Sequence, residues 1–196
     1  MRRRSFLLGG LSTATAILSS RRSSAAEIET WRSYNRERFE QVRTELASDR
    51  NRWIDVDLRR MKVTALQGDQ ILSYQGRQLV FLCDDGDIHN PTVTGHFYPD
   101  SSAENVSMSG SRQLSTDYKE YKDILTHYVI FFSRGYALHG LDPTYQTTGS
   151  HLSAGCIRLN YQDAQALYQS HQANPFTSIV VGYSDPDLTW PWYSVG

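Results

Sequence analysis

Hydrophobic residues recur at two different spacings along this chain of 196 residues, and the first spacing indicates a helix. Between Ile28 and Leu46 the hydrophobic residues fall at intervals compatible with one helical face, amid Arg and Glu. We predict an amphipathic helix over residues 27–51. Because surface helices mostly bury their hydrophobic stripe on their own core, we expect this face to pack across its own domain. Binding of a partner is the alternative.

From Trp53 the spacing changes to two, which indicates strands. Ile54 and Val56 alternate with Asp55 and Asp57, and glycine-containing turn signals follow at 68–69 and 76–77. This pattern predicts short antiparallel strands joined by hairpins. Further strands are expected at 78–83, 95–98, 127–132, 136–139 and 177–183.

Three other segments have patterns of their own. The stretch 99–118 is rich in Ser, Asn, Asp and Gly, which predicts a long surface loop. The stretch 162–171 predicts a short helix. Near the C-terminus, the aromatic cluster at 190–193 is expected to dock onto the sheet, since large aromatic residues mainly bury area. Stacking on a sugar ring is the alternative for this cluster.

The N-terminal residues 1–26 are typical of an export signal and not of a folded element. Arg2 to Leu7 carries the arrangement of a twin-arginine signal, and Ser24 to Ala26 offers small residues for cleavage. The weakly apolar run between them is too short for a permanent membrane helix, so no stable membrane span is expected after cleavage. A general secretory signal or an uncleaved anchor is the alternative. Each reading places the protein outside the cytoplasm, in the periplasm or cell wall of a bacterium.

Charge narrows the possible partners. The chain has 20 Lys and Arg against 21 Asp and Glu, a formal net charge of -1, which argues against nucleic acid as the main partner. The sequence has no H-E-x-x-H or C-x-x-C motif, so we expect no metal and no cofactor.

The segment from Ser153 to Asn160, with His139-Gly140 upstream, carries the clearest chemical signal. A cysteine beside glycine, Cys156 after Gly155, can present its thiol at a tight turn, with backbone N–H groups facing a bound carbonyl. A distant His can take the thiol proton. These groups are the minimum set for acyl transfer by a thiolate.

The same segment resembles the signature of the L,D-transpeptidases of bacterial cell walls, which reads HG, then a loop, then S-H-G-C-[IV]-[RN]. Residues 136–140 are similar to the first part and residues 153–158 to the second, except that Ala154 stands where the family has His. The opening strands from Trp53, the segment 91–97 and Met108-Ser109-Gly110 are also similar to the family in order. The resemblance covers residues 52–183.

The resemblance implies a mainly β fold, a β-rich sandwich with an N-terminal helix and a short helix after the cysteine. The expected organisation is a signal at 1–26, a helix at 27–51, a catalytic domain at 52–183 and an aromatic tail at 184–196. The implied substrate is the peptidoglycan stem peptide, whose third residue would be attacked at its carbonyl. The acceptor is left open: a second stem amine, a protein lysine on a wall protein, or water, as in an L,D-carboxypeptidase. A non-catalytic peptidoglycan-binding domain is the further alternative.

The resemblance also implies roles for individual residues. Cys156 is expected to be the nucleophile and His139 the proton donor and acceptor, with the Gly140 carbonyl orienting the imidazole. The N–H groups of Gly155 and Cys156 are expected to bind the oxyanion, and Ala154 leaves the effect of the missing His open.

Four more residues are expected to bind substrate. Arg158 offers a fork suited to a carboxylate, with an intramolecular ion pair as the alternative. Ser153 is expected either to orient the turn or to touch substrate, Tyr136 to contact substrate, and His151 to contact substrate or serve as an alternative base.

The two cysteines, Cys83 and Cys156, could form a disulfide in an oxidising compartment. Such a bond would consume the nucleophile, so we expect two free thiols, with Cys83 buried on a strand.

Overall fold

A computed structural model describes residues 25–114 and 117–194, and its core is formed by two sheets. The first sheet has the order β3-β2-β1-β14-β8, with β6 also paired to β2, and the second has the order β13-β11-β10-β9. The strands of the first sheet are β1 (Arg52–Asp57), β2 (Lys62–Gln67), β3 (Gln70–Ile71), β6 (Val80–Leu82), β8 (Gly95–Phe97) and β14 (Ser178–Gly182). The strands of the second are β9 (Ser101–Leu114), β10 (Asp117–Ser133), β11 (Tyr136–Gly140) and β13 (Ile157–Leu159).

Smaller elements complete the chain. Two short pairs are formed by β4 (Ser73–Tyr74) with β5 (Arg77–Gln78) and by β7 (Asp85–Gly86) with β12 (His151–Ser153). The helices are α1 (Ala25–Ser48), α2 (Tyr161–Ala173) and the 3-10 turn η1 (Pro191–Ser194). The predicted signal lies outside the described residues, apart from Ala25 and Ala26, which begin α1.

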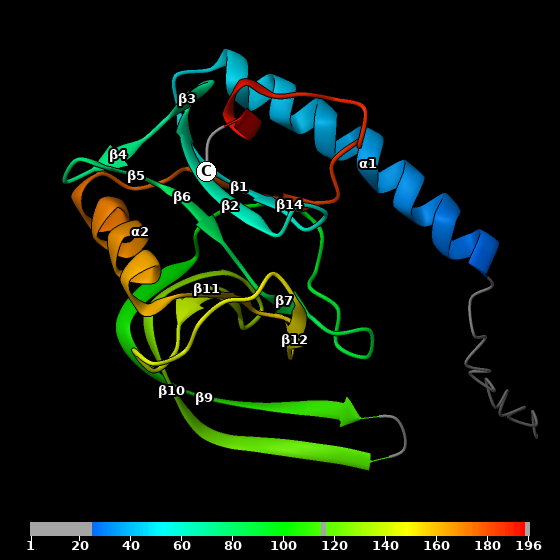
Figure 1. Cartoon of the computed structure of the whole chain (residues 1–196), viewed down its shortest axis with the longest axis vertical. Helices are drawn as coiled ribbons and strands as arrows, with labels where there is room; N and C mark the ends of the chain where they lie inside the picture. Colours follow the sequence, from blue (N-terminus) through cyan, green and yellow to red (C-terminus); the bar gives the residue numbers. More distant parts are fainter. Residues whose placement is uncertain (1–24, 115–116, 195–196) are drawn as a thin grey trace, which may run out of the picture.

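The two sheets share one hydrophobic core, as the predicted β sandwich requires. Val56 and Ile179 from the first sheet and Ile130 and Leu138 from the second are all buried in it. Helix α2 packs against β10 and β11 and contributes Leu167. Figure 1 shows α2 beside the second sheet and α1 across the first.

Each predicted strand overlaps an observed strand, but β7, β12 and β13 were not predicted, and the expected antiparallel direction was wrong for two pairings. Strands β1 and β2 form the expected antiparallel hairpin, but β14 runs parallel to β1, and β13 runs parallel to β11. Period-two alternation reports which face a residue occupies and carries no information about strand direction, so the sequence could not distinguish these pairings.

The predicted surface loop at 99–118 was wrong. Residues 101–114 form β9, which pairs along its length with β10 in a long hairpin that projects from the body of the molecule (Figure 1). The described side chains of β9 are exposed or half-buried. A strand that packs against no core needs no hydrophobic face, so its polar composition resembles that of a loop.

The expected packing of α1 and of the aromatic tail is confirmed. Phe39 and Val42 of α1 form a second hydrophobic cluster with Trp53, Leu66, Val180 and Trp192. The Trp192 ring meets Trp53 edge-on at 5.7 Å, so the tail docks onto the first sheet. This covering also buries Asp55 and Asp57, which lie on the face of β1 opposite Ile54 and Val56.

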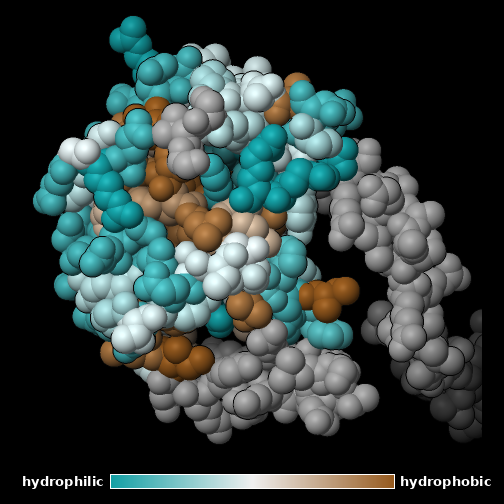
Figure 2. Space-filling view, viewed as in Figure 1, coloured by the Kyte–Doolittle hydropathy of each residue, from teal (hydrophilic) through white to brown (hydrophobic). Residues whose placement is uncertain are grey.

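Within residues 25–114 and 117–194, no helix combines the length and apolar character needed to cross a membrane. The same residues hold no cluster of three or more His, Cys, Asp or Glu able to ligate a metal ion. Figure 2 shows a mostly hydrophilic face, interrupted by separate hydrophobic patches.

Candidate active site

The two candidate catalytic residues are brought together by the parallel pairing of β11 with β13. In this register Leu138 lies opposite Ile157 and His139 opposite Arg158. Cys156 directly precedes Ile157, so it is level with Ala137 at the same edge of the sheet, two positions from His139 and on the same face. Residues separated by 17 positions in the sequence therefore meet because two short strands run side by side.

The turn that presents Cys156 depends on glycine. Gly155 has a φ of +110°, a conformation that residues with a side chain rarely adopt. A Cβ atom at this position would also lie 2.5 Å from Cε1 of Tyr136. Tyr136 therefore packs under the turn, a contact that its expected role in substrate binding did not include.

Ser153 stabilises the Gly155-Cys156 turn through two hydrogen bonds of its side chain. Its buried hydroxyl donates to the Cys156 carbonyl at 2.6 Å and accepts the Gly155 N–H at 2.9 Å. Orienting the turn was one of its two expected roles. The second bond occupies the N–H that we assigned to the oxyanion, so Gly155 is free to bind an oxyanion only after Ser153 rotates.

Thr92, which was not predicted from the sequence, connects this turn to a distant segment. The buried Thr92 hydroxyl donates to the Gly155 carbonyl at 2.8 Å and accepts the Gly86 N–H at 2.8 Å. Its place in the segment 91–97, which resembles the family, was the available signal.

His139 is buried and held in one orientation. Its Nδ1 lies 3.0 Å from the Gly140 carbonyl oxygen, the contact that the resemblance led us to expect. A carbonyl only accepts hydrogen bonds, so Nδ1 carries the hydrogen and Nε2 keeps its lone pair. Burial, together with the charge of Arg158, lowers the pKa of His139 to about 4 although the bond to Gly140 opposes this. The imidazole is therefore neutral at neutral pH and able to accept a proton.

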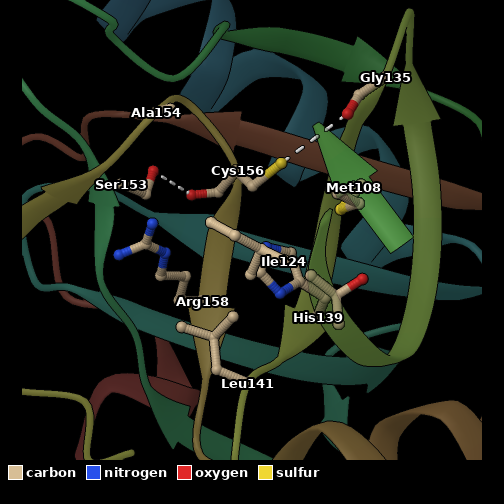
Figure 3. A pocket seen from close by; sticks show the side chains of 10 residues that line it. Met108, Ile124, Gly135, His139, Leu141, Ser153, Ala154, Cys156 and Arg158 are labelled. Carbon is tan, nitrogen blue, oxygen red and sulfur yellow. Dashed lines mark hydrogen bonds between the residues drawn. The ribbon is translucent and has the colours of Figure 1, made fainter. Parts of the chain in front are cut away.

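The Cys156 thiol is also neutral at rest. Burial raises its pKa, although Arg158 opposes this shift. The sulfur donates a weak hydrogen bond to the Gly135 carbonyl at 3.7 Å, and Figure 3 shows it directed toward Gly135. In the described part of the chain no hydrogen bond joins it to His139. A rotation of the thiol toward the imidazole must precede proton transfer.

Both groups line one cavity, which encloses about 140 Å³. Its walls are largely apolar, formed by Met108, Ile124, Leu141 and Ala154. An apolar wall excludes water and strengthens electrostatic interactions at the reacting atoms.

Arg158 supplies the cation at this cavity. Its Nη1 donates to the Leu152 carbonyl at 3.2 Å, and among the described residues it forms no ion pair with a carboxylate. The alternative role of Arg158, an intramolecular ion pair, therefore has no carboxylate partner in that part of the chain. A guanidinium lining the cavity in this way can receive a carboxylate of a ligand.

Asp84, which sequence reasoning also missed, organises the loop between the two halves of the site. Its buried carboxylate accepts the N–H groups of Thr148 at 3.0 Å and Ser150 at 2.8 Å and the hydroxyl of Tyr145 at 2.5 Å. Its backbone pairs with Arg158 in both directions, at 2.8 Å and 3.0 Å. Asp84 thereby fixes the backbone that carries the cation.

His151 lies apart from the cavity. Its Nδ1 contacts the buried Asp85 carboxylate at 2.5 Å, on the β7–β12 pair, and it does not line the cavity of Cys156. The geometry thus supports His139 over His151 as the base.

The two cysteines are free thiols, as expected. Cys83 is fully buried as expected, but the prediction that it lies on a strand was wrong, because β6 ends one residue earlier. Burial raises the pKa of its thiol. It takes no part in the cavity.

A cysteine and a neutral histidine that share one cavity at a sheet edge are typical of enzymes that transfer acyl groups through a thioester. A family model for the L,D-transpeptidase catalytic domain, YkuD, matches residues 51–181. The chain belongs to this family. No curated protein matches the sequence.

Solved structures agree in fold. The L,D-transpeptidase from Mycobacterium smegmatis is 19% identical with a TM-score of 0.53, and the match covers 67% of this chain and 58% of that one. L,D-transpeptidase 3 from Mycobacterium tuberculosis is 16% identical with a TM-score of 0.50, over 66% and 60% of the two chains. LdtMt1 in complex with imipenem is 20% identical with a TM-score of 0.50, over 66% and 58%. This chain therefore spans less than two thirds of the length of these proteins.

Proposed function

We propose that this protein is an exported L,D-transpeptidase that acts on peptidoglycan stem peptides through a thioester on Cys156. The observation that carries the proposal is a neutral His139, with Nδ1 held by Gly140, in one cavity with the Cys156 thiol. Family membership supplies the reaction class.

In the first half-reaction the Cys156 sulfur attacks the carbonyl carbon of the third stem residue. The thiol proton passes to Nε2 of His139, and a new S–C bond forms. The C–N bond to the terminal D-Ala then breaks, and Nε2 returns the proton to the leaving amine. The Cys156 N–H stabilises the oxyanion, joined by the Gly155 N–H once Ser153 releases it.

In the second half-reaction an amine of another stem attacks the thioester, the S–C bond breaks, and the proton lost by the amine passes through His139 to the thiolate. The product is a 3→3 cross-link. Arg158, with no carboxylate partner among the described residues, binds a carboxylate of the stem near the reacting bond.

Incubation of the mature protein with purified tetrapeptide muropeptides, followed by liquid chromatography and mass spectrometry, tests this proposal. We expect cross-linked dimers together with free D-Ala. Tripeptide products without dimers would instead indicate the hydrolytic L,D-carboxypeptidase. Unchanged tetrapeptides would contradict both enzymatic functions and favour a binding domain.

The proposed location outside the cytoplasm rests on residues 1–26. Replacing Arg3 and Arg4 with Lys should retain the protein in the cytoplasm if the signal is of the twin-arginine type. Fractionation followed by immunoblotting measures this, and unchanged export of the double variant would refute the twin-arginine route.

A further inference from the structure

A second cavity adjoins the catalytic one through a single turn. Strands β10 and β11 are joined by Arg134 and Gly135, with φ values of +31° and +93°. A two-residue hairpin loop with both φ values positive matches the twist of its strands, so the turn is well defined. Gly135 lines the catalytic cavity, and its neighbour Arg134 lines the second cavity.

This second cavity, which we call the aromatic bowl, is shallow and largely open to solvent, with a volume of about 380 Å³. Its lining includes His96, Phe97, Tyr98, Asp100, Phe132 and Arg134. Ligand sites in proteins commonly enclose roughly 300–1,000 Å³. The catalytic cavity, at about 140 Å³, falls below that range, so most of a large substrate must lie outside it.

The bowl carries an aromatic surface that is already built. Two of its lining residues, Phe97 and Phe132, pack their rings 5.2 Å apart as part of the hydrophobic core. The Tyr98 ring lies 5.1 Å from the His96 ring, and His96 Nε2 is 3.0 Å from the Ser178 hydroxyl on β14. Tyr98 is nevertheless 64% exposed. An exposed ring supported in this way is available to a ligand without ordering a flexible side chain.

Planar polar groups stand beside these rings. Asp100 and Arg134 both line the bowl, and the Asp100 N–H donates to the Phe131 carbonyl at 2.9 Å, which fixes the backbone there. A pyranose ring presents an apolar face of C–H groups and a rim of hydroxyls. Aromatic rings complement the face, while a carboxylate and a guanidinium complement the hydroxyl rim.

We propose that the aromatic bowl binds the glycan portion of the substrate whose stem peptide reacts at Cys156, with Tyr98 stacking on a sugar ring. This inference rests on the proposed function. Three extended residues span about 10 Å at roughly 3.3–3.6 Å each, so the third stem residue can lie about that far from the sugar. Because Arg134 and Gly135 are adjacent, the two cavities begin within that reach of each other.

Steady-state kinetics with two substrates test the proposal: a disaccharide-tetrapeptide and the same tetrapeptide without sugar. For the wild type we expect a lower KM with the sugar-bearing substrate. Tyr98→Ala should raise that KM roughly three- to tenfold, the value of one aromatic contact, and leave kcat and the sugar-free KM unchanged. Tyr98→Phe keeps the ring and should resemble the wild type. Leu188→Ala, at another exposed residue, is the control.

Equal KM values for the two substrates in the wild type, or equal effects of Tyr98→Ala on both, would overturn the proposal. If the wild type turns over neither substrate, the proposed function fails, and the bowl is judged by binding alone. Saturation-transfer NMR with the peptide-free disaccharide then decides. Transfer to the wild type that is lost in Tyr98→Ala supports the bowl, while no transfer, or transfer unchanged in the variant, refutes it.

Discussion

The catalytic cavity and the buried charges beneath the C-terminal tail show two opposite ways of burying polar groups. In the cavity, His139 and Cys156 are buried as neutral groups, and burial moves the pKa of each toward its uncharged form. Under the tail, Arg43 is fully buried as a cation among carboxylates. The first arrangement leaves a thiol and an imidazole available for the reaction that we propose, whereas the charged groups of the second are occupied by one another.

The charged cluster, formed by Arg43, Glu40, Asp55, Asp57 and Tyr193, is closely paired. Arg43 Nε donates to Asp55 at 2.8 Å, Nη1 donates to Glu40 at 3.2 Å and to the Tyr193 hydroxyl, and Asp57 lies 3.8 Å away. The Asp55 carboxylate also accepts the indole N–H of Trp192 at 3.1 Å. The cluster thus joins α1, β1 and the tail, and its stability depends on every partner being present.

Burial alone therefore does not make a group reactive. The reactivity that we propose for the cavity depends on a lone pair on Nε2 of His139 and on a Cys156 thiol with one weak acceptor, both of which line the cavity. Changes in the cavity should therefore affect turnover, and changes in the charged cluster should affect stability.

The largest expected effect is on turnover when the base is removed. His139→Ala should lower kcat by about two to four orders of magnitude, the usual contribution of a general base. His151→Ala is the matched control and should have a far smaller effect, because His151 contacts Asp85 outside the cavity. Single-turnover kinetics with a tetrapeptide substrate measure both, and the reverse ranking would show that His151 is the base.

The largest expected effect on folding comes from the charged cluster. Arg43→Ala should lower the free energy of unfolding by about 3–5 kcal/mol, because it leaves buried carboxylates without their cation. The exposed Arg50→Ala is the control and should change it by less than about 0.5 kcal/mol. Chemical denaturation gives both values. A loss of similar size in the two variants would contradict the importance of pairing.

The pH dependence of the rate tests the neutral state of His139. With a folded pKa of about 4, His139 remains able to accept a proton at pH 5 to 6, so the acid limb of kcat/KM should lie near pH 4. In the unfolded chain His binds a proton near pH ~6.5, so this group's contribution to stability is full above that pH and is lost as pH falls toward 4. The quantity to measure is kcat/KM at a series of pH values. An acid limb near pH 6.5 would mean that the His139 ring is exposed to solvent.

The smallest expected effect concerns Cys83, which is buried but lies outside both regions. Cys83→Ala should lower the free energy of unfolding by on the order of 1 kcal/mol and leave turnover per folded molecule nearly unchanged. Activity is measured with and without reductant on both proteins. If the wild type needs reductant for activity and the Cys83→Ala variant does not, Cys83 is instead a redox partner of Cys156.

The sequence could predict a region where its structure is determined by residues that are close together in the chain. The helix α1, the β1–β2 hairpin and the Gly155-Cys156 turn have local patterns, and all three were predictable. Strand β9 was missed because its pairing with β10 needs no hydrophobic residues. The adjacency of His139 and Cys156 came from the family resemblance and not from spacing.

The supporting residues were missed because their contacts join segments that are far apart in the sequence. Thr92 bonds to Gly155 across 63 positions, and Asp84 bonds to Ser150 across 66. Neither Thr92 nor Asp84 belongs to a periodic sequence pattern that would have indicated its role. Likewise, the burial of Asp55 follows from the covering α1 and tail, which the alternation in β1 alone cannot reveal.

Covalent trapping of the nucleophile tests the central claim most directly. Intact-protein mass spectrometry after incubation with a carbapenem should show one adduct on the wild type, located by digestion on the peptide that contains Cys156. Cys156→Ser should remain unlabelled, and His139→Ala should acquire the adduct far more slowly. An adduct on Cys83, or a folded wild type that acquires no adduct, would contradict the assignment of Cys156 as the nucleophile.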